Sequence, residues 1–243
     1  MNTHSMQIPK IIHQIWSGID GLLPSRLKQF GDTWKHHHPE WQYEFWDNQR
    51  MNDFVQTHYP QYWNTYSTFP YNIHRWDSIR YLILEKIGGI YADFDTECFK
   101  PLDELLKEKQ CCFSLEPEEN ARSLNLPFIF NNALMASVPN HPFMKEIVKV
   151  VFQQGISIPQ NLPAHKKTYD VLQTTGPLML VNLYKTYSDK ESIYLIPAIY
   201  TSPLVKSDCM KYLRGKRTEY LQEKLENAYA LHYFLNTWIP ALM

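Results

Sequence analysis

The stretch from Tyr71 to Pro101 constrains this chain most, because it predicts a helix, a glycine stop, a short strand and two carboxylates in succession. Gly88-Gly89 is typical of a helix end, since glycine tolerates the left-handed conformation found there. Residues 90–92 then suit a buried strand, which Asp93 and Asp95 close. The core-facing side of the helix is predicted from apolar residues at helical spacing: Ile79, Leu82, Ile83 and Ile87.

The other side of this predicted helix carries Asp77 and Arg80, together with Tyr81 and Leu84. Residues three apart are neighbours on a helix surface, so the aspartate and the arginine share a face. We expect this face to lie away from the core. A surface ion pair would account for the two residues equally well, at a value of about 0.3–0.5 kcal/mol.

Asp93 and Asp95 are two carboxylates on what would be one side of an extended strand. Neighbouring carboxylates repel and raise each other's pKa, and a cation removes that penalty. Oxygen donors suit Mg²⁺ or Mn²⁺, which also hold phosphate oxygens. The pattern therefore predicts a divalent-metal and diphosphate site at the carboxyl end of a strand, where open α/β sheets bind ligands. By itself, Asp-x-Asp more often marks a solvated loop.

The block resembles the sugar-binding region of family-32 glycosyltransferases, which include the yeast initiating α-1,6-mannosyltransferases, and more distantly the glucosyltransferase domain of clostridial toxins. The resemblance extends to residues 8–16, 131–143, 174–177 and 232–238, and so touches nearly the whole chain. Within the block the matching residues are Arg75, Asp77, Arg80, Tyr81, Gly88, Gly89, Tyr91, Asp93 and Asp95.

This resemblance implies an α/β protein with the A-type nucleotide-sugar transferase fold, a Rossmann-like arrangement with a mixed central sheet flanked by helices. No linker interrupts the sequence, so we expect a single domain over residues 1–243. The implied activity is transfer of a hexose from a nucleoside diphosphate sugar to a saccharide or lipid-linked saccharide, with retention of anomeric configuration. The expected setting is bacterial capsular or surface polysaccharide synthesis.

The resemblance also assigns roles to individual residues. Asp77 and Arg80 would contact the donor sugar, and Asn131 and Asn132 would supply amides to the sugar pocket. The nucleotide side would comprise Ile15, Trp16 and Asp93, with Trp238 in the tail as a mobile cover; Ile15 and Trp16 could equally be core residues of a first strand. The metal, Mn²⁺ or Mg²⁺, would be held by Asp93, Asp95 and His232, although a packed histidine is the alternative for His232.

Composition and charge exclude several other classes. The net charge of −1 gives no basic patch for nucleic acid. The N-terminus lacks the features of a signal peptide, and no apolar run approaches the roughly 20 residues that span a bilayer. The 4 cysteines fit neither a zinc knuckle nor a disulfide framework, so we expect free thiols. We therefore expect a cytoplasmic enzyme with no transmembrane segment, free to make peripheral contact with the inner face of a membrane.

Two alternative functions remain open on sequence grounds. Asp93-Phe-Asp95-Thr96 also fits a phosphatase or phosphotransferase of the haloacid-dehalogenase type, but that class needs a downstream acidic pair that the sequence lacks. A non-catalytic module that binds carbohydrate or a nucleotide sugar is the second alternative.

Periodicity and breakers predict the other elements. Two segments are expected to be loops: 116–125, which is acidic, and 155–167, which could act as an acceptor lid. Strands are expected at 10–16, 41–46, 110–115, 128–135, 193–196 and 229–233. Helices are expected at 24–38, 51–66 with a break at Pro60, 102–109, 141–153 and 177–187, and a solvated helical face at 206–224.

Overall fold

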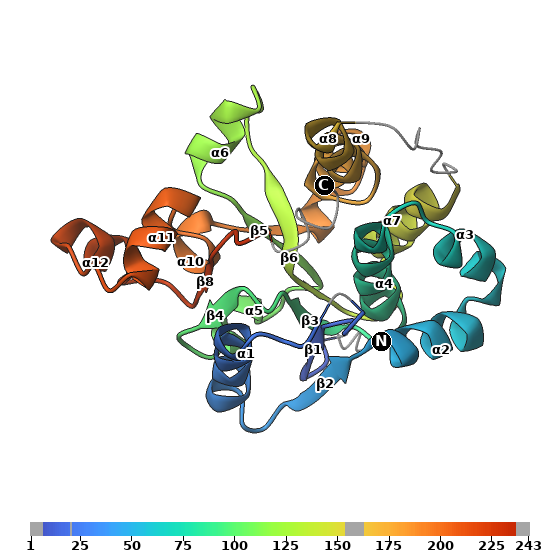
Figure 1. The fold of residues 1–243 in the computed structure, drawn as a ribbon, viewed down its shortest axis with the longest axis horizontal. Helices are drawn as coiled ribbons and strands as arrows, with labels where there is room; N and C mark the ends of the chain where they lie inside the picture. Colours follow the sequence, from blue (N-terminus) through green and yellow to red (C-terminus); the bar gives the residue numbers. More distant parts are fainter. Residues whose placement is uncertain (1–6, 20, 154–162, 237–243) are drawn as a thin grey trace, which may run out of the picture.

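A computed structural model describes residues 7–19, 21–153 and 163–236 (Figure 1). Its centre is a six-stranded sheet in the order β2-β1-β3-β6-β5-β7, and β4 pairs separately with β8. The strands are β1 Ile11–Ile15, β2 Gln42–Trp46, β3 Gly89–Ala92, β4 Thr96–Cys98, β5 Cys111–Leu115, β6 Phe130–Ser137, β7 Tyr194–Ile196 and β8 Ala230–His232.

The central sheet is mixed. β1 runs parallel to both β2 and β3, and β5 runs parallel to β7, whereas β6 is antiparallel to its neighbours β3 and β5. The amino end of β6 therefore lies at the same edge of the sheet as the carboxyl ends of β1, β3 and β5. This edge is where ligands bind in open α/β sheets.

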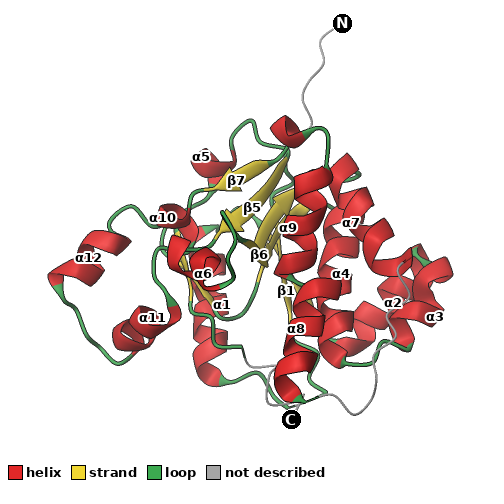
Figure 2. Cartoon of the chain, turned by 90° about the horizontal axis from the view of Figure 1, so that it is seen from above, coloured by secondary structure: helices red, strands yellow, loops and turns green. Residues whose placement is uncertain are grey.

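Helices cover both faces of the sheet (Figures 1 and 2). Strand β3 is buried throughout, with Tyr91 packed in one apolar cluster and Ile90 and Ala92 in the other, as alternation along a strand requires. The helices are α1 Ser25–His37, α2 Asn48–His58, α3 Trp63–Ser67, α4 Asn72–Lys86, α5 Asp103–Leu106, α6 Glu118–Ser123, α7 Pro142–Gln153, α8 Ala164–Thr174, α9 Pro177–Thr186, α10 Ala198–Thr201, α11 Lys206–Leu213 and α12 Glu219–Leu225, with short 3₁₀ turns η1 Pro60–Tyr62 and η2 Lys190–Ser192.

The predicted helix, glycine stop and strand are confirmed in α4 and β3. Gly88 and Gly89 both adopt positive φ, at 74° and 102°. Space also requires glycine here: a Cβ on Gly88 would lie 2.8 Å from the carbonyl oxygen of Ser137, and one on Gly89 would lie 2.6 Å from that of Ile11. The two glycines let α4 turn directly into the sheet between β1 and β6.

Two expected loops prove to be partly helical. Within 116–125 the structure has α6, whose first turn carries Glu118 and Glu119, where the helix dipole favours acidic residues. Arg122 pairs with Glu118 one turn away. Of the expected loop 155–167, residues 154–162 lie outside the described part, and α8 begins at Ala164, just after Pro163. Proline before a first turn favours a helix start, which our reading of prolines as loop markers overlooked.

Two smaller differences concern element bounds. The expected helix 102–109 is only one turn long, Asp103–Leu106, because Glu108 adopts a positive φ of 61°. The strand expected at 128–135 is β6, Phe130–Ser137, which runs without a break through Asn131 and Asn132, while its partner β5 is irregular between Phe113 and Leu115.

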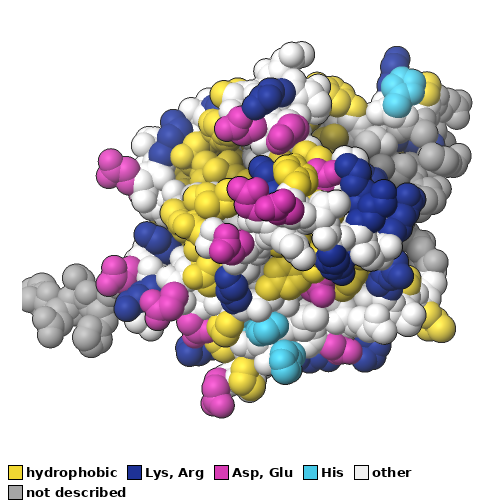
Figure 3. Space-filling model, turned by 90° about the vertical axis from the view of Figure 1, so that its left-hand side faces the viewer, with side chains coloured by type: hydrophobic (Ala, Val, Ile, Leu, Met, Phe, Trp, Pro, Cys, Tyr) yellow, Lys and Arg dark blue, Asp and Glu magenta, His cyan; other side chains and the backbone are white. Residues whose placement is uncertain are grey.

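The surface that carries α11 and α12 shows acidic and basic side chains interleaved (Figure 3). This agrees with the solvated helical face predicted for 206–224. The 4 cysteines are all buried and unpaired, as expected. Across the described residues, no helix combines the length and apolar character needed to cross a membrane.

Candidate active site

A cavity of about 500 Å³ lies at the edge of the sheet where β1, β3 and β5 end and β6 begins. Its walls come from residues that follow these strands, from α4 and from the start of α9. All nine site residues that the sequence predicted within the described part of the chain line this cavity: Ile15, Trp16, Asp77, Arg80, Asp93, Asp95, Asn131, Asn132 and His232.

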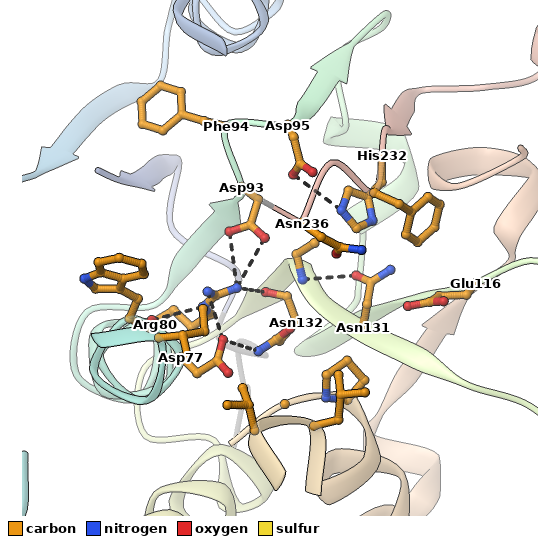
Figure 4. A pocket seen from close by; sticks show the side chains of 18 of the residues that line it. Asp77, Arg80, Asp93, Phe94, Asp95, Glu116, Asn131, Asn132, His232 and Asn236 are labelled. Atoms are coloured by element: carbon orange, nitrogen blue, oxygen red, sulfur yellow. Dashed lines mark hydrogen bonds and ion pairs between the residues drawn. The ribbon is translucent and has the colours of Figure 1, made fainter. Parts of the chain in front are cut away.

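Asp93 and Asp95 lie in a tight turn rather than on an extended strand, so the strand alternation we expected is wrong. β3 ends at Ala92, and both the backbone N–H and the hydroxyl of Thr96 donate to the carbonyl oxygen of Asp93, at 3.0 and 2.6 Å. The Phe94 ring points away from the carboxylates of Asp93 and Asp95 and is buried against aromatic side chains of other elements (Figure 4). The buried ring fixes the turn, so that both carboxylates still face the cavity.

Strand pairing brings the chain's tail to this turn. β8 is antiparallel to β4, with His232 opposite Thr96. His232 Nε2 lies 3.4 Å from Asp95 Oδ1, and the backbone N–H of Leu235 donates to Asp95 Oδ2 at 2.8 Å (Figure 4). One ligand atom from each of Asp93, Asp95 and His232 lies within 4.8 Å of the others.

The three groups shift one another's protonation. Burial alone would raise the pKa of Asp95, but the neighbouring His232 brings it below its usual value. Burial alone would lower the pKa of His232, and Asp95 raises it above the usual value. Burial raises the pKa of Asp93, although Arg80 opposes that shift. The cluster therefore carries concentrated negative charge that one histidine only partly offsets.

Arg80 is the centre of a buried network, which corrects our expectation that its helix face lies away from the core. Asp77 and Arg80 are 4% and 5% exposed, because this side of α4 packs against β6 and borders the cavity. The guanidinium contacts Asp77 Oδ1 at 3.0 Å and Asp93 Oδ1 at 3.2 Å, and donates to the carbonyl oxygen of Asn132 at 2.9 Å. A surface ion pair is thus excluded.

Asp77 accepts two further hydrogen bonds, from the Thr175 hydroxyl at 2.9 Å and from Asn132 Nδ2 at 2.9 Å. Burial raises the pKa of Asp77 to about 6, against the lowering effect of Arg80. The network ties α4, β6 and the short segment between α8 and α9 together, and it orients Asp93 through Arg80. Tyr91 adds a hydroxyl that donates to Asp93 Oδ1.

The two asparagines differ in their hydrogen bonding. Asn132 Nδ2 donates to Asp77 and to the Tyr81 hydroxyl, and is satisfied within the protein. Asn131 is 2% exposed and accepts backbone N–H bonds from Ala133 and Leu134 at 3.1 and 3.3 Å. Its Nδ2 is buried and has no hydrogen-bond partner among the described residues. Asn131 therefore keeps an unused donor in the cavity wall.

Ile15 and Trp16 line the cavity at the end of β1. The Trp16 indole N–H donates to the carbonyl oxygen of Gly21 at 2.9 Å, and its ring meets Phe94 edge-on, with centroids 6.3 Å apart. Trp238, predicted to cover the donor, lies outside the described residues, as does much of the expected acceptor lid.

Sequence reasoning missed three residues of the site. Glu116 falls in the acidic segment expected to be a loop, but it lines the cavity directly after β5. The signal was available, since a polar residue that follows a strand at the ligand-binding edge is a candidate. Thr175 and Tyr91, which bind Asp77 and Asp93, lay within segments that we had matched to the family but were given no role.

The donor set of Asp93, Asp95 and His232 fits a divalent cation. Carboxylate oxygens and imidazole nitrogens are ligands of Mn²⁺ and Mg²⁺ in proteins. Here one such atom from each of the three residues lies within 4.8 Å of the others. His232 Nδ1 is buried without a hydrogen-bond partner among the described residues, so the imidazole is not committed elsewhere. This observation fits a metal-ligand role better than that of a packed histidine.

A mixed α/β sheet with an Asp-x-Asp turn, a distant histidine and a buried arginine at its ligand-binding edge is the arrangement of the A-type nucleotide-sugar transferase fold. Residues 24–112 match the family model described as "Glycosyltransferase sugar-binding region containing DXD motif". This part of the chain is similar to that family, and Asp93-Phe-Asp95 is a DXD sequence within the matched residues.

The relatives are themselves glycosyltransferases by name. Inositol phosphoceramide mannosyltransferase 3 of Schizosaccharomyces pombe is 31% identical over 191 residues, which cover 76% of this chain and 47% of that protein. Uncharacterized glycosyltransferase L373 of Acanthamoeba polyphaga mimivirus is 29% identical over 240 residues, covering 97% of this chain and 85% of that protein. The chain spans about half the length of the first curated relatives that it matches.

The fold is shared with a toxin domain. The ligand-free glycosyltransferase domain of the YGT toxin superposes with a TM-score of 0.56 at 9% identity, covering 92% of this chain and 90% of that one. These findings confirm the A-type fold and the resemblance to fungal mannosyltransferases and toxin glycosyltransferase domains. They give no support to the haloacid-dehalogenase alternative, and a measured turnover separates an enzyme from a non-catalytic binding module.

Proposed function

We propose that this chain is a metal-dependent glycosyltransferase that moves a hexose from a nucleoside diphosphate sugar to a hydroxyl group of a saccharide or a glycosylated lipid, with retention of configuration. The observation that carries the proposal is the cluster of Asp93, Asp95 and His232, which shares one cavity with the Asp77–Arg80 network. Retention rests on the family resemblance alone.

The residues divide the work between binding and orientation. Asp93, Asp95 and His232 would hold Mn²⁺ or Mg²⁺, which when bound acts as a Lewis acid toward the diphosphate leaving group. Ile15 and Trp16 offer an apolar surface and a ring for the nucleoside. Asn131 offers an unused amide donor to a sugar hydroxyl in the cavity, and Asp77 and Arg80 border the space where the hexose would lie.

The buried network prepares the site before substrate arrives. Arg80 holds Asp93 in place while Asp77 fixes Arg80, so their geometry is not re-formed in each catalytic cycle. Preorganised charge of this kind lowers the cost of stabilising charge that develops during reaction. The cavity also shields the donor from bulk water, which favours transfer over hydrolysis.

Mannose is the first donor sugar to test, because the S. pombe relative is named as a mannosyltransferase. That relative's name also places its acceptor among inositol phospholipids, so lipid-borne acceptors stand beside the surface polysaccharides expected from sequence.

The test is a screen of nucleoside diphosphate sugars, including GDP-mannose and UDP-glucose, for release of the nucleotide with Mn²⁺, with Mg²⁺ and with EDTA. We expect hydrolysis of one donor that requires the metal and is lost in Asp95→Asn. Hydrolysis that is equal with EDTA would contradict metal dependence. Absence of both binding and hydrolysis across the panel would contradict the transferase proposal.

A further inference from the structure

Glu116 occupies a part of the cavity wall to which the donor-binding residues above do not extend. It follows β5, and its backbone N–H donates to the carbonyl oxygen of Ile129 at 2.9 Å, which extends the β5–β6 pairing by one residue. Its side chain points into the cavity toward Asn131 (Figure 4). Glu116 Oε2 accepts a hydrogen bond from Asn120 Nδ2 at 2.9 Å.

The Glu116 carboxylate is partly exposed and faces the cavity. Among the described residues, no lysine or arginine forms an ion pair with it, and Asn120 donates to its Oε2. Burial raises its pKa, although Asn120, His232 and Asn131 oppose the shift. A carboxylate can accept several hydrogen bonds, so Glu116 can take a further one from a ligand in the cavity.

Asn131 provides an independent observation beside it. Backbone N–H groups hold its carbonyl oxygen, which directs the amide nitrogen into the wall next to Glu116, where that nitrogen has no hydrogen-bond partner among the described residues. The Glu116 carboxylate, which can accept further hydrogen bonds, therefore lies beside the Asn131 amide nitrogen, which can donate them. A sugar hydroxyl both donates and accepts, so a single hydroxyl can satisfy both groups.

The location favours the acceptor over the donor. The metal cluster, Ile15 and Trp16 define the donor side of the cavity. From Glu116 the wall continues along α6 through Asn120 and Ser123 to Leu124, which is 39% exposed. This polar strip leads from the reacting centre outward, as an incoming second saccharide requires.

We propose that Glu116 and Asn131 bind a hydroxyl of the acceptor saccharide and orient it toward the donor, with Asn120 holding the Glu116 carboxylate in position. This inference rests on the proposed transferase function and names the acceptor subsite within the same cavity. The contact is a hydrogen bond from the sugar hydroxyl to Glu116, combined with one from the Asn131 amide to the same oxygen.

The test uses Glu116→Gln and Glu116→Ala, with Glu119→Gln as the control on the exposed side of α6. Nucleotide release is measured without acceptor, then with methyl α-mannoside and its monodeoxy analogues as acceptor probes. Melting temperatures establish that the variants fold. If Glu116→Ala does not fold, the test relies on Glu116→Gln, which keeps the shape of the side chain.

We expect the KM for the methyl mannoside to rise about tenfold or more in both Glu116 variants, a larger change than in acceptor-free donor hydrolysis, since the lost bond involves a charged group. The wild type should use one deoxy analogue poorly as an acceptor, because that analogue lacks the hydroxyl that Glu116 binds. Replacing Glu116 by glutamine should reduce transfer to this analogue little further. Such coupling between one hydroxyl and one side chain would not arise from a structural role.

Three results would overturn the inference. An unchanged acceptor KM in both variants would remove Glu116 from the acceptor subsite, and a parallel loss of hydrolysis and transfer would place it on the donor side. If removal of each hydroxyl reduces transfer equally in the wild type and in Glu116→Gln, Glu116 does not bind an acceptor hydroxyl. If the wild type hydrolyses no donor at all, the transferase proposal itself fails, which is a distinguishable result.

Discussion

His232 and Asp95 face each other across the β4–β8 pair, with the imidazole Nε2 3.4 Å from the carboxylate Oδ1. Asp93 completes a group whose ligand atoms lie within 4.8 Å of one another. The metal site is therefore assembled from two distant segments that a short antiparallel ladder holds together. Its geometry depends on the strand register as much as on the ligands.

Removing either side of this pair should weaken metal binding without unfolding the chain. We expect Asp95→Asn and His232→Ala each to weaken Mn²⁺ binding about tenfold or more, because a three-ligand site loses a donor. Asparagine can still accept the Leu235 N–H bond, so Asp95→Asn should retain the melting temperature. Electron paramagnetic resonance of free Mn²⁺ measures the affinity, and His36→Ala, at an exposed histidine, is the control. Wild-type Mn²⁺ affinity in both variants would refute the site.

Two substitutions of Arg80 test the positive charge of its side chain and the geometry of its hydrogen bonds separately. Arg80→Ala should lower the free energy of unfolding by about 3–5 kcal/mol, because Asp77 and Asp93 would remain buried without a counter-charge. Arg80→Lys keeps the charge but cannot bridge both carboxylates and the Asn132 carbonyl at once. We therefore expect Arg80→Lys to lose turnover more than about tenfold with a smaller loss of stability. Denaturant titration and donor hydrolysis measure the two effects.

The exposed Arg122→Lys is the matched control for that experiment, since its pair with Glu118 lies on the surface. Normal turnover and donor affinity in Arg80→Lys would mean that the guanidinium geometry is dispensable, and that Arg80 acts only as a buried charge.

Gly31 in α1 should control the DXD turn through Phe94. A Cβ on Gly31 would lie 2.5 Å from Phe94 Cε1, so the ring must move, and Phe94 sits between the two aspartates. Helix propensity alone favours alanine over glycine by about 1 kcal/mol. We expect Gly31→Ala instead to weaken Mn²⁺ binding. In the double variant Gly31→Ala/Phe94→Leu, the smaller leucine side chain should relieve the clash and restore part of the Mn²⁺ affinity. A more stable Gly31→Ala variant with unchanged Mn²⁺ affinity would disprove this coupling.

His13 should make the fold sensitive to acid. Its Nε2 contacts the Gly88 carbonyl oxygen at 2.9 Å, and its Nδ1 accepts the Trp46 indole N–H at 3.1 Å, an arrangement that needs a neutral ring. Burial lowers the pKa of His13 to about 4, against an ordinary 6.5. The unfolded chain therefore binds the proton first as pH falls, and stability present above pH 6.5 is lost progressively toward pH 4.

The size of this loss is about 3 kcal/mol, from about 1.4 kcal/mol for each unit of pKa difference. Urea unfolding of wild type and His13→Gln at several pH values between 7 and 4 measures it. The glutamine variant should show a flatter dependence by that amount, whereas His36→Gln should follow the wild type. Identical pH slopes in wild type and His13→Gln would show that His13 does not titrate in this window.

Local patterns in the sequence predicted α4, the glycine turn, β3 and the two aspartates, because helix periodicity, glycine's tolerance of positive φ and strand hydrophobicity act over a few residues. The family resemblance then supplied the fold and the other site residues, including His232. Local pattern failed for the Asp77–Arg80 face, which is buried because β6 and the segment before α9 cover it.

Tertiary structure alone decided which of these groups meet. The antiparallel direction of β6 places Asn131 beside the end of β3, and the pairing of β8 with β4 places His232 at Asp95. Glu116 enters the cavity for the same reason, since β5 ends at the same edge. Strand direction and register arise from contacts between distant segments, and no local pattern encodes which strands will pair.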